Sequence, residues 1–242
     1  MGSILITGAS GGIGRACAER FLDAGWTVGL MARRADKLEE VAAGHENAVV
    51  LPGDVGDAAA VETAFAQFAD KAGRLDVLFN NAGIFTPAAP IDEISLDDWH
   101  RARSVNLDGM FYCARAAFAQ MRRQSPQGGR IINNGSISAH SPREGSATYT
   151  TTKHAITGLT KTISLDGRHF DIACGQIDIG NARTELLDGI IEKAKAAGEA
   201  PPPSMDVGLV ADAVMNMATL PGEANVQFMT IMATKMPYIG RG

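Results

Sequence analysis

Short apolar runs alternate with longer stretches of helical periodicity along most of the chain. The runs are Ser3–Thr7, Trp26–Met31, Ala48–Leu51, Leu75–Phe79, Arg130–Asn134, Asp171–Asp178 and Val226–Met232. Between them, apolar residues recur three or four positions apart, as in residues 106–121, which indicates helices. Continuous apolar strands separated by helices predict a parallel sheet that is buried on both faces. We therefore expect an α/β fold with a doubly wound parallel sheet of about seven strands, flanked by helices.

No linker or internal repeat divides the 242 residues, and 45% of them are apolar, enough for a sizeable core. We therefore expect a single domain over residues 1–242. The alternation changes after Asp178, where a helical stretch from Glu185 runs into three consecutive prolines, Pro201–Pro203. Proline cannot continue a helix. We interpret residues 184–205 as a lid over a substrate at the carboxyl edge of the sheet.

The net charge is −5 and no basic run is present, which argues against nucleic acid and anionic membranes as partners. No apolar run approaches about 18 residues, so no transmembrane helix is expected. The first residues, MGSILITGAS, lack the regions of a signal peptide. Cys17, Cys113 and Cys174 lack the spacing of a metal site or a disulfide framework, and we expect all three to be buried. A cytoplasmic protein without a bound metal fits these features.

A glycine-rich segment follows the first apolar run and leads into a helical stretch. Its spacing is Gly8-x-x-x-Gly12-x-Gly14, with Ser10 where a G-x-G-x-x-G motif has its middle glycine. A strand, a glycine loop and a helix in this order present backbone N–H groups to a phosphate. A plain turn is the alternative, but the position at the first strand-to-helix junction favours a phosphate site in a Rossmann-like fold.

The second apolar run is followed by Ala32, Arg33 and Arg34. In dinucleotide-binding folds, an acidic residue here binds the ribose 2′-hydroxyl, whereas an arginine accommodates a 2′-phosphate. The absence of a carboxylate favours NADP over NAD. The alternative is that both arginines are ordinary surface charges at the start of a helix.

Residues 136–153 carry the candidate chemistry. Tyr149 and Lys153 are four residues apart, which places them on one helical face. A phenol has a pKa of about 10, and a neighbouring positive charge favours its phenolate form. Such a group can exchange a proton with a carbonyl or an alcohol. Ser136 lies at the end of a predicted strand, where it could hydrogen-bond the same oxygen. For a Y-x-x-x-K spacing alone, a half-buried tyrosine beside a solvated lysine would be the ordinary interpretation.

Several motifs occur together in a specific order: TGASGGIG at 7–14, GDV at 53–55, NNAG at 80–83, VNLDG around Asn106, then Ser136 and Tyr149-x-x-x-Lys153. In this combination the chain resembles the short-chain dehydrogenase/reductase family, from Thr7 to about Met232. The resemblance implies reversible hydride transfer between a nicotinamide cofactor and a carbonyl or secondary alcohol. It also implies a homodimer or homotetramer formed through the helices that contain Asn106 and Tyr149.

The resemblance assigns the catalytic roles to four residues. Tyr149 would be the general acid and base, and Lys153 would lower its pKa and bind the nicotinamide ribose. Ser136 would orient the substrate oxygen. Asn106 would stabilise a kinked helix and hold a water in a proton relay to Lys153.

The resemblance also implies a set of cofactor-binding residues, with NADP(H) favoured over NAD(H). They are Gly8, Ser10, Gly12, Ile13, Gly14, Arg33, Arg34, Asp54, Val55, Asn81, Ala82, Gly83, Tyr149, Lys153, Ile179, Gly180 and Thr184. The chain departs from the family at two points. Gly11 stands where many NADP-dependent members have Lys or Arg, and Ile179-Gly180 stands where the family usually has Pro-Gly.

The sequence carries less information about the substrate. Ser138 and His140 lie between Ser136 and Tyr149 and are candidates for the pocket. In the lid, Leu186, Leu187 and Ile190 at helical spacing could form an apolar roof, or could equally be core or an interface. Arg143 and Glu144 could also rim the pocket, but loop surface is the interpretation that we favour for both. Keto esters, 3-oxoacyl compounds, sugars and other ketones all remain candidates.

Two other functional classes compete with a reductase. One is a non-catalytic NAD(P)-binding sensor or structural subunit. Such proteins often lose a catalytic residue, whereas all four are present here. The other is a dehalogenase or isomerase on the same fold, and Lys153 and the three loop glycines argue against it.

Overall fold

The computed structural model describes residues 2–239 and centres on a parallel sheet of seven strands. Their order across the sheet is β3 (Ala48–Pro52), β2 (Thr27–Ala32), β1 (Ser3–Thr7), β4 (Val77–Asn80), β5 (Gly129–Asn134), β6 (Ile172–Ile179) and β9 (Phe228–Ile231). Every neighbouring pair is parallel. The predicted Rossmann-like, seven-stranded sheet is therefore confirmed. The strand order reverses between β1 and β4, where ligands bind in such sheets.

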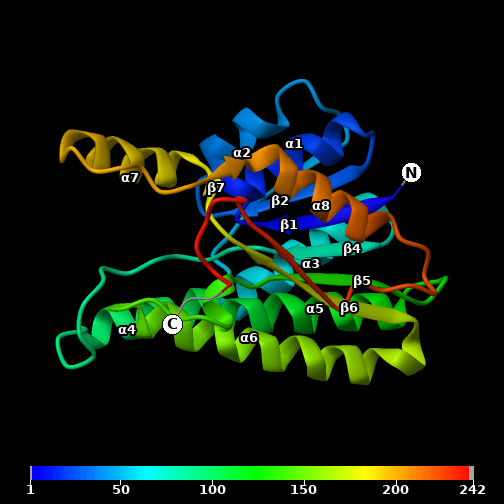
Figure 1. The fold of residues 1–242 in the computed structure, drawn as a ribbon. Coiled ribbons are helices and arrows are strands. Elements are labelled where there is room, and N and C mark those ends of the chain that lie inside the picture. The colour runs from blue at the N-terminus through cyan, green and yellow to red at the C-terminus, as the bar shows by residue number, and fades with distance from the viewer. Residues whose placement is uncertain (1, 240–242) are drawn as a thin grey trace.

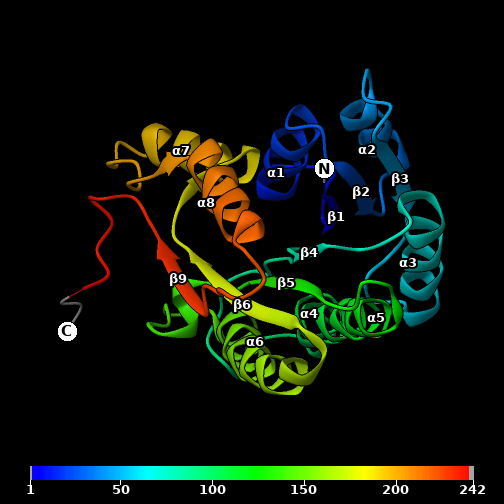
Figure 2. The same cartoon turned by 90° about the vertical axis from the view of Figure 1, so that its right-hand side faces the viewer.

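Helices cover both faces of the sheet, as Figures 1 and 2 show. One layer contains α1 (Gly12–Asp23), α2 (Ala35–Ala42) and α8 (Val207–Thr219), and the other contains α3 (Ala58–Ala72), α5 (Met110–Arg123) and α6 (Ala147–Asp166). The strands are buried on both faces because each layer packs an apolar core against them, around Phe21 on one face and Phe68 on the other. Cys17, Cys113 and Cys174 are buried in these elements, as expected.

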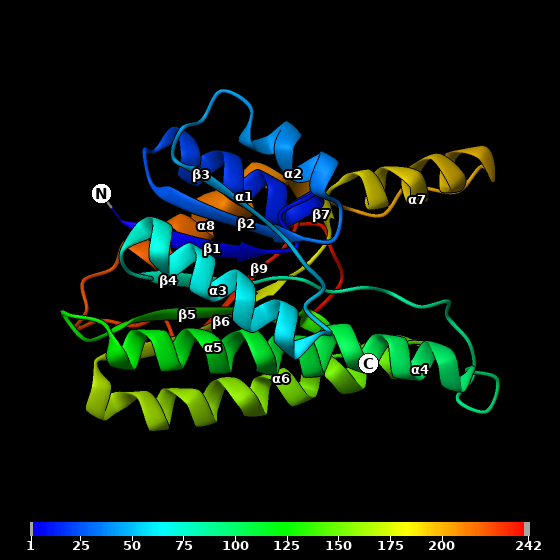
Figure 3. The same cartoon turned by 180° about the vertical axis from the view of Figure 1, so that it is seen from behind.

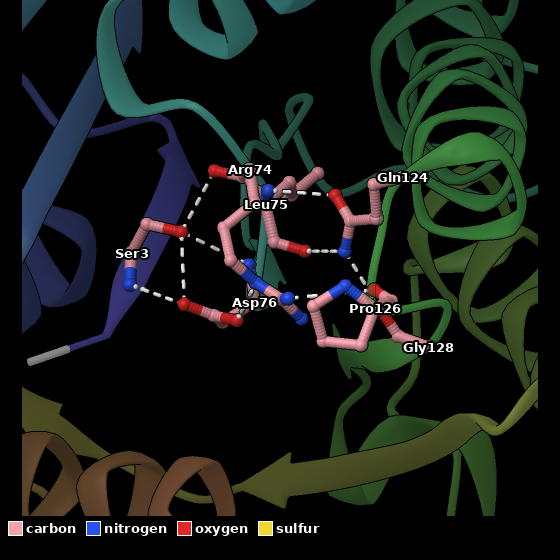
Figure 4. Close-up of polar contacts among 7 residues, drawn as sticks. All are labelled: Ser3, Arg74, Leu75, Asp76, Gln124, Pro126 and Gly128. Atoms are coloured by element: carbon pink, nitrogen blue, oxygen red, sulfur yellow. Dashed lines mark hydrogen bonds and ion pairs between the residues drawn. The ribbon is translucent and has the colours of Figure 1, made fainter.

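Polar contacts at the amino edge of the sheet join the starts of β1 and β4 (Figure 4). The Asp76 carboxylate accepts from the Ser3 backbone N–H at 2.8 Å and from its hydroxyl at 3.1 Å. The Gln124 side chain pairs with both backbone groups of Leu75 at 2.9 Å and donates to the Gly128 carbonyl at 2.7 Å. These side chains form hydrogen bonds with backbone groups that the strand pairing of the sheet leaves free. They lie at the edge of the sheet opposite the carboxyl ends of the strands.

One long helical stretch changes its winding in the middle. It consists of α4 (Leu96–Arg103), a π-helical turn (Ser104–Gly109) and then α5. The Ser95 hydroxyl caps its start by accepting from the Asp98 N–H at 3.0 Å. π-Helical turns are rare and occur frequently at functional sites. This one contains Asn106.

The segment after β6 extends beyond the sheet (Figures 1 and 3). A two-residue strand, β7 (Ala182–Arg183), pairs in parallel with β8 (Met205–Asp206), and α7 (Glu185–Ala196) lies between them. The sequence predicts this helix to Ala200, but it ends at Ala196, and Gly198 follows in the left-handed region with φ of 71°. Within the described residues, no helix is long and apolar enough to cross a membrane.

Candidate active site

The loop between β1 and α1 has the backbone shape of a phosphate cradle. Gly8 and Gly12 have φ values of 71° and 55°, a conformation that favours glycine. A side chain at Gly14 would place its Cβ 2.2 Å from the Gly8 carbonyl oxygen, so only glycine fits there. Within residues 2–239, no side chain caps the start of α1, which begins at this loop. Its N–H groups and positive dipole end are therefore available to an anion, and the loop fits a dinucleotide.

One cavity of about 350 Å³ extends from this loop across the ends of β2 and β3. Ser10, Arg33, Arg34, Asp54 and Val55 line it. The Arg34 Nη2 lies 3.2 Å from both the carbonyl oxygen and the hydroxyl of Ser10. In the part of the chain that the structure describes, Arg33 makes one long, exposed ion pair, with Asp54 at 3.9 Å. The structure thus gathers two guanidinium groups and a hydroxyl where the sequence places the adenosine ribose.

A second cavity, of about 480 Å³, contains the candidate chemical groups. Ser136, Tyr149 and Lys153 line it, together with Ile13, Ile179 and Gly180. It shares part of its wall with the first cavity, so the two form the ends of one elongated site. The shared residues are Gly8, Gly11, Gly12, Ala82, Gly83 and Thr184.

Tyr149 lies in the first turns of α6 and is partly exposed in this second cavity. The Phe85 ring stacks on it, with ring centroids 4.3 Å apart and planes at 23°. Removal from water raises the pKa of the Tyr149 phenol, whereas the Ser136 hydroxyl and the charge of Arg143 act to lower it. The phenol is therefore protonated at neutral pH and suited to donate a proton.

Lys153 lies one turn further along α6 and is only 2% exposed. Its Nζ donates to the backbone carbonyl of Asn134 at 2.7 Å and lies 5.5 Å from the centre of the Tyr149 ring. Burial lowers its pKa to about 8, although the negative charge of Asp178 acts in the opposite direction. A buried ammonium with one backbone partner has donor capacity left for a ligand hydroxyl.

Asn106 is fully buried in the π-helical turn. Its Oδ1 accepts from the Ile84 N–H at 2.7 Å, and its Nδ2 donates to the Ile84 carbonyl at 2.9 Å. This two-bond contact fixes the loop after β4, which contains Gly83 and Phe85. The structure therefore links the altered helix winding to one wall of the cavity.

Asn81 connects the carboxyl ends of three strands. Its amide donates to the Thr7 carbonyl at 2.9 Å and accepts from the Asn134 amide at 2.9 Å. The N–H groups of Asn81 and Ala82 both donate to the Thr7 hydroxyl at 2.9 Å. Asn81 thus holds the cavity wall in place while lining it.

Asp178 is a fully buried carboxylate near the end of β6 that sequence reasoning missed. It accepts from the Ser136 N–H at 2.8 Å, from Gln176 Nε2 at 2.8 Å and from His140 Nε2 at 2.9 Å. Gly135 leaves room for it, because a Cβ there would lie 2.1 Å from its Oδ1. The sequence does carry a signal for Asp178, because it is a charged residue inside the apolar run IACGQIDIG.

The structure does not bring two of the four candidate substrate residues into the cavity wall. Ser138 is buried behind it, and the His140 ring is turned toward Asp178. Leu187 does line the cavity, whereas the side chain of Leu186 lies outside the described residues. Ile190 of the lid also lines the cavity, and so does Arg143, for which loop surface is the interpretation favoured by the sequence. Phe85 and Met236 line it as well and were not expected from the sequence.

Comparison with known proteins identifies the family. A short chain dehydrogenase family model matches residues 3–195. The chain is 34% identical to the 3beta-hydroxysteroid dehydrogenase of Mediterraneibacter gnavus over 189 residues, 76% of this chain and 67% of that protein. It is 30% identical to Sulfoacetaldehyde reductase 2 of Chromohalobacter salexigens over 243 residues, 97% of this chain and 95% of that protein.

A solved structure agrees with these matches. The closed form of serine dehydrogenase complexed with NADP+ superposes with a TM-score of 0.89 at 27% identity, covering 99% of this chain and 98% of that one. NAD(P) is the cofactor type of these proteins. The chain belongs to the short-chain dehydrogenase/reductase family and is an NAD(P)-dependent oxidoreductase that acts on alcohol or carbonyl groups.

Proposed function

We propose that the protein is an NADP(H)-preferring enzyme that interconverts a carbonyl compound and a secondary alcohol, with Tyr149 as its general acid and base. The observation that carries the proposal is the meeting of Tyr149, Ser136 and Lys153 in one cavity that reaches the glycine loop. A proton donor, a second hydroxyl and a buried cation are the groups that reduction of a carbonyl requires.

The nicotinamide cofactor supplies or accepts the hydride when it is bound. In the reducing direction, the hydroxyls of Ser136 and Tyr149 orient the carbonyl oxygen, and Tyr149 gives it a proton. Lys153 holds the ribose hydroxyls with the donors that the Asn134 carbonyl leaves free and favours the phenolate that results. The loop fixed by Asn106 keeps the reactants in place, which makes the reaction effectively intramolecular.

The NADP(H) preference is supported by the charges at the adenosine end. Arg33 and Arg34 line that cavity beside Ser10, and Ala32 offers no carboxylate to a ribose 2′-hydroxyl. Changing Arg33 and Arg34 together to Ala should lower kcat/KM for NADPH at least about tenfold, because guanidinium–phosphate hydrogen bonds are among the stronger ones. It should leave kcat/KM for NADH nearly unchanged. Equal losses with both cofactors would contradict the preference.

The test of the function is NADPH and NADH oxidation by the purified protein against a panel of carbonyls. The panel includes β-keto esters, diketones, keto sugars, aromatic aldehydes and steroid ketones. We expect turnover of at least one class and its loss in Tyr149→Phe. Tight NADPH binding with no turnover across the panel would favour the non-catalytic sensor instead.

We also propose roles for α7 and for the outer face of α5 and α6. The α7 helix carries Leu187 and Ile190 at the cavity and acts as the lid. Phe111 and Leu165 are 48% and 56% exposed. A third hollow, which is separate from the two cavities of the active site and mostly apolar, lies between α5 and α6. Apolar exposure of this extent supports a homodimer or homotetramer that buries this face.

A further inference from the structure

Arg143 is the residue of the catalytic cavity that the proposed mechanism leaves without a role. It lies in the loop between Ser136 and Tyr149, and its side chain lines the cavity. Its charge acts on the Tyr149 phenol. Arg143 therefore belongs to the reacting end of the site, whereas Arg33 and Arg34 line only the adenosine end.

The guanidinium of Arg143 has no counter-ion among the described residues. It takes part in no ion pair or side-chain hydrogen bond there, whereas other surface arginines, such as Arg20 and Arg115, pair with carboxylates at 2.7 and 3.0 Å. No described aspartate or glutamate lines the catalytic cavity, and the neighbouring Glu144 is not in its wall. A cation without a partner in a cavity without carboxylates is arranged to receive an anion.

The loop that carries Arg143 is held in place by its neighbours. The Arg143 carbonyl accepts from the Ser146 hydroxyl at 2.6 Å, and the Gly145 carbonyl accepts from the Ala89 N–H at 3.2 Å. Gly145 has a φ of 68°, which favours glycine and turns the chain into α6. The base of the side chain is thus fixed relative to Tyr149, so the anion and the reacting oxygen would have a defined separation.

The remaining wall of the cavity limits the rest of the ligand. Phe85, Leu187, Ile190 and Met236 provide apolar surface. The volume of about 480 Å³ must hold the nicotinamide end of the cofactor as well, which leaves room for a small molecule. The cofactor phosphates belong at the glycine loop, so an anion at Arg143 would come from the substrate.

We propose that Arg143 binds an anionic group of the substrate, and that the enzyme acts on small oxo acids or hydroxy acids in which an acidic group and the reacting carbon are joined by a short apolar segment. The proposal rests on the proposed function and adds the substrate class to it.

The test compares acids with their neutral methyl esters. Acetoacetate, 4-oxobutanoate and 4-oxopentanoate, each beside its ester, are assayed with NADPH against wild type, Arg143→Met and Arg143→Lys. Arg168→Met serves as the control, because Arg168 is exposed and lies outside both cavities. NADPH binding is measured for every variant by fluorescence titration.

We expect wild type to prefer at least one acid over its ester in kcat/KM by about tenfold or more, the scale of one charge-assisted hydrogen bond. Arg143→Met should lower the acid-to-ester ratio of kcat/KM to about one while keeping NADPH affinity, because a change in the Tyr149 pKa affects both substrates alike. Arg143→Lys should retain part of the preference, and Arg168→Met should behave as wild type. Equal use of acids and esters by wild type, or a preference that survives in Arg143→Met, would overturn the proposal.

A binding arm separates failure of the substrate class from failure of the proposed function. If none of these compounds is turned over, saturable binding of the acids to the protein–NADP+ complex is measured by calorimetry. Binding that weakens about tenfold or more in Arg143→Met supports an anion site. Absence of binding, or equal binding by both proteins, overturns it.

Discussion

Burial of the Lys153 ammonium lowers the stability of the protein but places a cation beside Tyr149. A pKa lowered by burial from 10.5 to about 8 corresponds to about 3 kcal/mol against the charged form. This is the net cost, because the pKa of about 8 already includes the hydrogen bond that the Asn134 carbonyl accepts. We therefore expect Lys153→Met to lose turnover without losing stability at pH 7.

The cost of burying the Lys153 ammonium makes the free energy of unfolding depend on pH. Between about pH 8 and 10.5 the unfolded chain holds the Lys153 proton and the folded protein does not, so this group makes wild-type unfolding free energy rise with pH. Lys153→Met lacks that rise. Denaturant unfolding of both proteins from pH 7 to 10 measures it. If the unfolding free energies of the two proteins change with pH in parallel, burial of the ammonium costs no stability.

Asp178 acts on Tyr149 and Lys153 from behind the cavity wall. Asp178→Asn replaces one acceptor oxygen of a carboxylate that receives three hydrogen bonds, and should cost about 1–3 kcal/mol of stability. The negative charge of Asp178 raises the pKa of Tyr149, so its removal should also shift the pH profile of alcohol oxidation toward lower pH. His140→Ala is the matched control, because it removes one donor and keeps the charge. An unshifted profile in Asp178→Asn would contradict this role.

At the scale of single elements, the glycine loop and the start of α1 form one unit. Gly14→Ala would press a methyl group to within 2.2 Å of the Gly8 carbonyl, so the loop must open or α1 must move. We expect NADPH affinity to fall at least about a hundredfold, because the helix N-terminus would no longer face the phosphates.

Gly158→Ala is the control for that prediction. Nothing lies within 4 Å of the Cβ position of Gly158 in α6, and alanine favours a helix by roughly 0.5–1 kcal/mol. It should keep cofactor affinity and raise the melting temperature. Unchanged NADPH titration of Gly14→Ala would contradict the close packing of loop and helix.

Elements were easier to predict from the sequence than the contacts between them. The strands are continuous apolar runs separated by helices, so the local pattern predicts their existence and their parallel pairing, but it gives no order for them across the sheet. The π-helical turn was not visible as such, because the apolar spacing on both sides of Asn106 is that of an α-helix. The predicted helix of the lid extends to the prolines, whereas α7 ends at Ala196, because the chain turns at Gly198 before it reaches them.

The site shows the same difference between local and long-range information. Tyr149, Lys153 and the glycines belong to short motifs, and the structure gathers them in one place. The sequence pattern does not single out Asp178, and it favours loop surface for Arg143, because the surroundings of both side chains depend on residues far along the chain. A carboxylate is ordinarily expected at the surface, and only the structure shows the three hydrogen-bond donors around Asp178. A loop arginine is also expected at the surface, and only the structure shows that Arg143 lines a cavity.

At the scale of the whole molecule, the exposed apolar face of α5 and α6 is the feature that a monomer leaves unexplained. We expect a homodimer or homotetramer by light scattering, and Phe111→Asp should shift it toward the monomer, since a charge at the centre of an apolar interface is left without a partner. Glu39→Lys, at an exposed position in α2 on the opposite face of the sheet, provides a charge-changing control. A wild-type monomer at micromolar concentration would contradict the expected assembly.

The most direct test of the whole account is the turnover number of Tyr149→Phe for a carbonyl that wild type reduces, with NADPH affinity measured on the same samples. Removing the one hydroxyl that gives the proton should lower kcat by at least about a hundredfold, the scale of general acid catalysis. NADPH affinity should stay within a few-fold of wild type. Wild-type turnover in Tyr149→Phe would show that the proton comes from another group and would contradict the assignment of the active site.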